Sequence, residues 1–225
     1  MELKPIPREH HYTFGLLVMT ASTGSIDAVS YLALDRVFTG NMTGNVLFLG
    51  FGLVGVGGIP FLNNSVALLG FLVGLIVSSR IIGRNRAKGL PLSSRWVLGA
   101  GAALIIAVAA FWLTARSLDH VALLAVTALL AMVMGSQVSA VKPIGNTDVT
   151  TIVVTNTLVN LARDSHLAGG KGENWLPRFG AVVAMGVGAA IGAGIVGWLG
   201  GPWALLGSAV IFSLGTLTLV WASRR

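Results

Sequence analysis

Residues 38–45 read FTGNMTGN, a polar, glycine-rich stretch that follows the apolar helical pattern containing GSIDA at 24–28. The other half of the chain repeats this arrangement, with GSQVS at 135–139 followed by TT at 150–151 and VTNT at 154–157. Hydrocarbon excludes polar, broken backbone unless protein or a wet cavity surrounds it. Two such breaks at corresponding positions of two halves are typical of a fold with a solute site between them.

The composition is that of a membrane protein with several spans. Of the 225 residues, 54% are hydrophobic and 10% are charged, whereas a soluble domain carries about 25% charged residues. The net charge of +7 comes from basic residues that lie between apolar runs, where the positive-inside rule places them, so we expect no nucleic-acid partner. The chain has no Cys, and its four His have no ligand spacing, so we expect no disulfide, cofactor or metal site.

A spanning helix needs about 20 mostly apolar residues, and several segments reach this length. The predicted spans are Tyr12–Leu34, Phe61–Ile82, Arg95–Ala115, Leu118–Val141, Arg178–Leu199 and Trp203–Ala222. Two further apolar segments, Thr43–Val56 and Val149–Ala162, are short, and each follows a break. A cleaved signal peptide fits the N-terminus poorly, because the helical pattern continues past Thr23.

The loop charges decide whether the short segments cross. The loop containing Arg84, Arg86 and Lys88 has no acidic residue, so we expect it, with both termini, on the cytoplasmic side. Every loop obeys this rule only if the short segments are half-helices. The sequence predicts an all-α polytopic integral membrane protein with six spanning helices and two half-helices. A cytoplasmic tail (1–11) precedes two inverted repeats, 12–115 and 116–225, each ordered span, half-helix, span, span. Flat interfacial helices are the alternative, which weak amphipathicity and the lack of Lys or Arg disfavour.

Asp27 is the only acidic residue well inside a predicted span. An acid at such a position is a functional candidate by default. Thr20, Thr23, Asp27 and Ser30 recur at three- and four-residue steps and therefore share one helix face. We expect Asp27 to be a proton- or cation-coupling group. The alternative is that it binds backbone or Asn amides at the helix break.

The two breaks supply the candidate solute-binding residues. Free N–H groups at the start of a half-helix attract polar or anionic groups, glycine allows close approach, and Asn and Thr add donors and acceptors. The candidates are Thr39, Asn41, Thr43, Gly44 and Asn45 in the first half, and Gln137, Thr151, Thr155 and Asn156 in the second. Simple capping and turn formation are the alternative for the Asn and Thr residues.

At these motifs the chain resembles the YoaK-like family of bacterial inner-membrane proteins of unknown function. The matching pieces are GSIDAVSYL at 24–32, FTGNMTGN at 38–45 with LG at 49–50, and, more loosely, GSQ at 135–137, TT at 150–151 and VT at 154–155. The resemblance covers nearly the whole chain. It implies a multi-pass protein of the bacterial cytoplasmic membrane and supplies no substrate or mechanism.

Together these patterns predict a small secondary transporter that binds a polar solute between the breaks. A channel-type pore lined by the half-helices and a non-transporting membrane scaffold are the alternatives. We expect no enzymatic activity, because no nucleophile–base pair, phosphate loop or HExxH motif lies in the spans. Small residues every four positions, such as Gly188 and Gly192, predict close packing in the lipid bilayer and would allow a homodimer.

Overall fold

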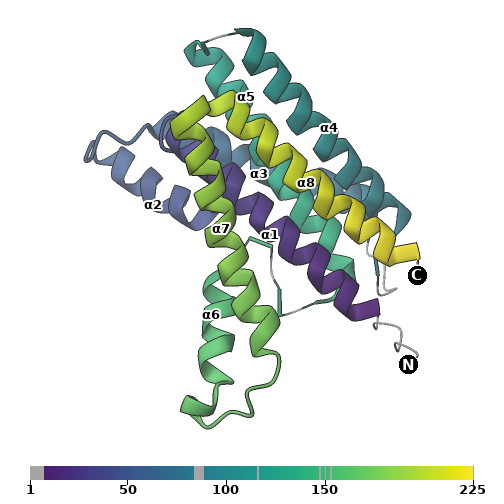
Figure 1. Ribbon diagram of the computed structural model, residues 1–225. Coiled ribbons are helices and arrows are strands. Elements are labelled where there is room, and N and C mark those ends of the chain that lie inside the picture. The colour runs from purple at the N-terminus through teal and green to yellow at the C-terminus, as the bar shows by residue number, and fades with distance from the viewer. Residues whose placement is uncertain are drawn as a thin grey trace.

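The regular structure of the described residues is entirely helical (Figure 1). The computed structural model describes residues 8–83, 89–115, 117–146, 148–149, 151–152 and 154–224. The α-helices are α1 (Arg8–Ala33), α2 (Met42–Leu53), α3 (Phe61–Ile82), α4 (Leu92–Ala115), α5 (His120–Val141), α6 (Val154–Arg163), α7 (Trp175–Leu199) and α8 (Gly201–Arg224). Two 3-10 turns, Lys142–Ile144 and His166–Ala168, follow α5 and α6.

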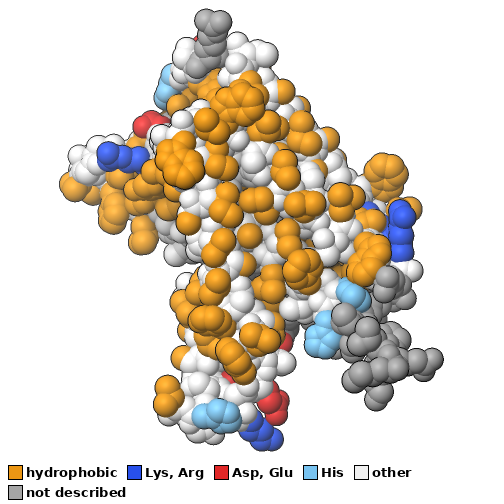
Figure 2. Space-filling model, in the orientation of Figure 1, with side chains coloured by type: hydrophobic (Ala, Val, Ile, Leu, Met, Phe, Trp, Pro, Cys, Tyr) orange, Lys and Arg blue, Asp and Glu red, His pale blue; other side chains and the backbone are white. Residues whose placement is uncertain are grey.

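Six of these helices are long and apolar enough to span a membrane, which confirms the predicted all-α polytopic class. They are α1, α3, α4, α5, α7 and α8, and α3 has the predicted bounds. The start of α1 and the end of α8 lie at the same end of the bundle (Figure 1). Hydrophobic side chains cover the visible sides of α7 and α8, while charged side chains lie near the helix ends (Figure 2). A bilayer requires this distribution, because apolar side chains face its lipid and helices satisfy their own backbone.

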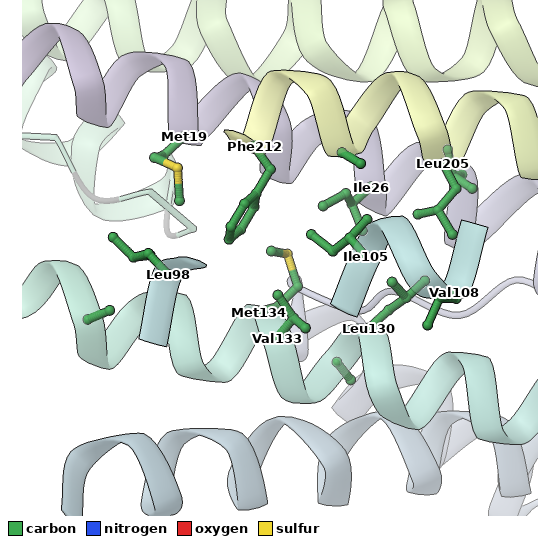
Figure 3. Close-up of a cluster of buried hydrophobic side chains, with 14 of the residues drawn as sticks. Met19, Ile26, Leu98, Ile105, Val108, Leu130, Val133, Met134, Leu205 and Phe212 are labelled. Carbon is green, nitrogen blue, oxygen red and sulfur yellow. The ribbon is translucent and has the colours of Figure 1, made fainter. Parts of the chain in front are cut away.

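The largest buried apolar side chains meet between α1 and α8 on one side and α4 and α5 on the other (Figure 3). Met19 and Ile26 of α1 and Phe212 of α8 are almost completely inaccessible. Ile105 of α4 and Met134 of α5 point toward them from the other helices (Figure 3). These side chains interdigitate between the four helices. Such packing matters in a bilayer, because van der Waals contact replaces the hydrophobic effect as the force that associates helices there.

Close backbone contact joins α1 to α7, and glycines make it possible. A Cβ atom at Gly24 would overlap the carbonyl oxygen of Met185, and one at Gly188 would overlap the carbonyl oxygen of Ala21. The next residue of the predicted small-residue stripe, Gly192, lies against Ser25 in the same way. Helices can approach this closely only where the side chain is missing.

Glycines also allow close backbone contact between α3 and α5. A Cβ atom at Gly135 of α5 would overlap the carbonyl oxygen of Phe71, and one at Gly74 of α3 would overlap the carbonyl oxygen of Met132. These two pairs are the most extensive helix contacts in the described structure. In each pair, a helix that precedes a break packs against a helix of the other half, so the halves interlock.

The two short helices differ from each other. The first, α2, is apolar on all sides, as predicted, and packs against α3. The second, α6, begins at Val154 rather than Val149 and is strongly amphipathic, so the expectation of weak amphipathicity was wrong for it. Side-chain contacts hold the chain before α6: the Asn146 side-chain oxygen accepts hydrogen bonds from the N–H groups of Asp148 and Val149, and the Asp148 carboxylate accepts one from Arg178 of α7. The prediction also used four residues that lie outside the described residues, namely Arg84, Arg86, Lys88 and Thr150.

Candidate functional site

The carboxylate of Asp27 binds the backbone of the first break. Its Oδ1 accepts hydrogen bonds from the N–H groups of Thr39 (3.0 Å) and Gly40 (2.6 Å) and from the Thr39 hydroxyl (3.4 Å). Its Oδ2 accepts from the N–H of Asn41 at 3.0 Å. The Asp27 side chain is only 8% exposed. The only acid inside a span therefore fastens the segment that leads into α2.

The predicted anion site at the start of α2 is occupied by a side chain of the protein itself. The N–H groups that precede α2 do converge on a negative charge, as such groups do at helix starts, but the charge belongs to the chain's own Asp27. Gly40 allows the approach, since a Cβ atom there would lie 3.2 Å from Asp27 Oδ2 and 3.1 Å from Thr23 Cγ2. Backbone binding, the structural alternative raised for Asp27, is thus present in the fold.

Asn41 and Asn45 also hold the break. The Asn41 side-chain oxygen accepts from the N–H of Gly44 at 3.4 Å and so caps α2. Asn45 is fully buried, and its amide group makes two hydrogen bonds to Phe38, accepting from the N–H at 3.0 Å and donating to the C=O at 2.6 Å. The Phe38 ring stacks on Tyr31 with a centroid distance of 4.9 Å. Both asparagines therefore stabilise the conformation of the first break, as the capping and turn alternative expects.

A buried polar contact connects α5 to this region. Gln137, 1% exposed, donates a hydrogen bond from Nε2 to Thr23 Oγ1 at 3.2 Å, one helical turn before Asp27. Its Oε1 has no hydrogen-bond partner among the described residues. The predicted polar face of α1 is buried, but Thr20 and Thr23 bond back to carbonyls of their own helix.

One cavity, with a volume of about 1540 Å³, lies between the two breaks. Of the predicted site residues, those that line it are Asp27, Asn41, Thr43, Gly44, Thr151 and Thr155. Thr39, Asn45, Gln137 and Asn156 do not line it. Three of these four are buried beside the break or behind α1, and Asn156 is exposed on α6. The structure thus brings polar residues of both halves to one hollow.

Sequence reasoning missed how the second break is fastened. Arg178, 9% exposed at the start of α7, donates from Nε to Asp148 Oδ1 at 2.9 Å and from Nη1 to the Asn160 carbonyl at 3.2 Å. Its Nη1 also contacts Asp164 Oδ2 at 2.5 Å. The available signal was an Arg at the start of an apolar span with two Asp in the segment before it.

The comparisons with known proteins agree with this architecture. A family model described as a protein of unknown function (DUF1275) matches residues 15–218. The chain is also similar to the UPF0700 transmembrane protein YoaK of Bacillus subtilis (strain 168), with 34% identity over 151 residues. That match covers 66% of this chain and 64% of the relative, slightly less than two thirds of the relative's own length. No solved structure matches the chain significantly.

Proposed function

Since the chain belongs to the DUF1275 family of unknown function, the YoaK-like family that its motifs resemble, we propose from its geometry that it is a small secondary transporter. Its solute occupies the cavity between the two breaks and is contacted there by Asn41, Thr43, Thr151 and Thr155. The membrane is the bacterial cytoplasmic membrane, with both termini on the cytoplasmic side.

A single observation carries this proposal: residues of both breaks line the same cavity. The α7 residues that line it fall between Val182 and Ala193, in the middle of a helix that runs from Trp175 to Leu199. If α7 spans the bilayer, the cavity lies near the midplane. Sites at this depth, formed by broken helices of two repeats, are typical of secondary transporters.

The proposal includes inverted repeats with breaks that enter from opposite faces. The glycine contacts support it, because Gly24 and Gly135 occupy matching places in the two halves and meet equivalent helices. The uniformly apolar surface of α2 supports a place for this helix inside the hydrocarbon. Its 12 residues would reach about 18 Å, more than half of a hydrocarbon core about 30 Å thick.

Asp27 couples transport to a proton or cation in this proposal. A protonated carboxyl group loses acceptor capacity, so proton binding would weaken the hydrogen bonds that hold Thr39, Gly40 and Asn41. The break could then move relative to α1. Two other titratable residues line the cavity, Tyr31 and Lys142, and variants of both belong in any test of pH dependence.

Cysteine accessibility tests the proposal without knowledge of the solute. The chain has no native Cys, so Thr43→Cys can be treated with a membrane-impermeant thiol reagent in intact cells and in inverted vesicles. A transporter presents the cavity to both sides in turn, so labelling from both sides is expected. Gly50→Cys on the same helix is the matched control, because Gly50 is exposed but does not line the cavity. Labelling of Thr43→Cys from one side only would reject alternating access.

The coupling role has its own readout. Relative to a loop control, Val56→Cys, labelling of Thr43→Cys should accelerate at acidic pH and lose this acceleration when Asp27→Asn is added. An unchanged pH profile in the double variant would remove Asp27 from the coupling mechanism.

A channel is the second candidate, because the cavity is long. Its lining residues on α1 extend from Leu16 to Leu32, about 24 Å at the rise of a helix. Sustained single-channel current after reconstitution would favour the channel over the transporter. The scaffold alternative instead predicts that Asn41, Thr43 and Asn45 tolerate Ala with changes in stability alone.

A further inference from the structure

The size and walls of the cavity identify the kind of molecule that fits it. A volume of about 1540 Å³ exceeds the roughly 300–1,000 Å³ of ordinary small-molecule sites. Along α7 the lining residues are small or apolar, among them Val182, Met185, Ala189 and Ala193. A small, strongly hydrated solute would leave this wall without a partner, whereas an apolar chain would cover it.

The cavity also opens sideways in the middle of α7, where Gly186 and Ala190 line it and are exposed. The opening continues to Leu32 near the end of α1, which lines the cavity and is 55% exposed. The outline of the molecule is hollowed between α2 and the lower part of α7 with α6 (Figures 1 and 2). Exposed positions at this depth face lipid chains rather than water. A molecule can therefore enter from the bilayer without crossing the aqueous phase.

Polar groups gather at the end of the cavity where α5 finishes. Lys142, Asn146 and Thr151 line this end, and Lys142 has no ion-pair partner among the described residues. The nearby Asp148 already pairs with Arg178 at 2.8 Å. This end thus offers an unpaired positive charge with neutral donors beside it, which suits a negatively charged head group.

The negative charge of Asp27 is far from this end. Asn146 donates to Thr13 Oγ1 at 3.2 Å, which places the polar end beside Thr13 of α1. Asp27 lies fourteen residues further along the same helix, about 21 Å away. Its carboxylate oxygens already accept hydrogen bonds from the break, so it offers little to a cationic head group.

We propose that the cavity binds an anionic amphiphile that enters from the bilayer, with its apolar chain along α7 and its head group at Lys142, Asn146 and Thr151. This inference rests on the proposed function, because it names the substrate class for the same cavity. The lateral opening supplies the route, and the polar end fixes the orientation.

Photocrosslinking of the full chain in lipid nanodiscs tests the inference. The probe is a fatty acid with a photoreactive diazirine in its chain, and the charge control is an amine of equal chain length. Crosslinks of the fatty acid should concentrate on the cavity-lining α7 residues between Val182 and Ala193. Lys142→Gln should weaken binding of the fatty acid by up to about fivefold, the strength of an exposed ion pair, and leave the amine unaffected.

A matched pair of α7 variants controls for position and folding. Gly186 and Gly194 both have open space at the Cβ position, but only Gly186 lines the cavity. Gly186→Trp should abolish most α7 crosslinking, and Gly194→Trp should not. Equal labelling of the two Trp variants, or equal labelling by the fatty acid and the amine, would overturn the inference. A disulfide between two copies of an Ala190→Cys variant would also overturn it, because a second copy would then cover the lateral opening.

The outcomes separate this inference from transport. If Thr43→Cys is reached from both sides but the fatty acid does not label the cavity, transport stands and the substrate class is wrong. If the fatty acid labels the cavity but Thr43→Cys is closed to one side, the site binds an amphiphile without transporting it.

Discussion

Replacement of Asp27 by Asn tests whether the carboxylate stabilises the first break through its hydrogen bonds or is only an unpaired buried charge. In the structure, the two carboxylate oxygens accept three backbone hydrogen bonds, from Thr39, Gly40 and Asn41, at 3.0, 2.6 and 3.0 Å. Asparagine keeps one acceptor oxygen and presents an NH₂ group where the other oxygen was. The variant therefore loses about one hydrogen bond to a charged group, worth about 1.5–3 kcal/mol.

Asp27→Ala removes every acceptor. Each N–H left without an acceptor costs about 1–3 kcal/mol, which for three groups gives an upper limit of about 9 kcal/mol. Asn41 is exposed, so water can replace part of the loss there, and we expect about 3–5 kcal/mol in total. The predicted order of stability is Asp, then Asn, then Ala.

Hydrogen exchange measured by mass spectrometry on the peptide 38–45 reports this directly. A local loss of about 2 kcal/mol speeds exchange about 30-fold, at tenfold per 1.4 kcal/mol. Asp119→Asn is the matched control, because Asp119 accepts from the Ala122 N–H at an exposed helix start, where Asn caps about equally well. If Asp27 were only an uncompensated buried charge, its neutralisation would stabilise the fold. Slower exchange, or a higher melting temperature, in Asp27→Asn would therefore refute the fastening role.

Three further predictions concern thermal stability in detergent and protease sensitivity. Gln137→Leu removes a buried oxygen without a partner and also the hydrogen bond that Nε2 donates to Thr23, so the two effects offset and stability should change by less than about 1 kcal/mol. A larger loss of melting temperature would show that the oxygen has a partner in the working protein. Gly188→Ala should destabilise by about 1–3 kcal/mol, because its Cβ has no room, whereas Gly194→Ala should be neutral or stabilising, and equal melting temperatures would contradict the packing. Arg178→Gln should increase proteolysis in residues 160–175 strongly, because it leaves two Asp without their partner. Asp164→Asn should increase it only slightly, since Asp164 is 43% exposed, and the reverse order would disprove this account of the second break.

The spanning helices could be predicted because the bilayer imposes one rule on every residue within it. Phe61–Ile82 coincides with α3 in both bounds, and length and hydropathy alone were sufficient. The helix-packing glycines were also visible, since their four-residue spacing has one common cause. The start of α6 was harder to predict, because Val149 and Val154 are both apolar and the contacts that hold the chain before Val154 come from the side chains of Asn146 and Arg178.

The candidate site was predictable in its parts and not in its contacts. The breaks identified Thr43, Thr151 and Thr155, and the structure places all three on one cavity. The partners of Asp27 could not be derived, because its contacts are to backbone N–H groups, which every residue type carries. The apolar α7 wall was missed for a related reason, since residues such as Ala189 look the same in sequence whether they face lipid, a helix or a cavity.

The sidedness of the two loops that follow the short helices tests the central claim, that the halves are inverted repeats whose breaks enter from opposite faces. Val56, 63% exposed, follows α2, and Lys171, also exposed, follows α6. Val56→Cys and Lys171→Cys, each the only cysteine in its variant, are treated with an impermeant thiol reagent in intact cells and in inverted vesicles. The account predicts labelling of Val56→Cys from outside and of Lys171→Cys from the cytoplasm. Labelling of both from the cytoplasm would mean that α2 crosses the membrane, and the inverted repeats and their shared midplane site would be wrong.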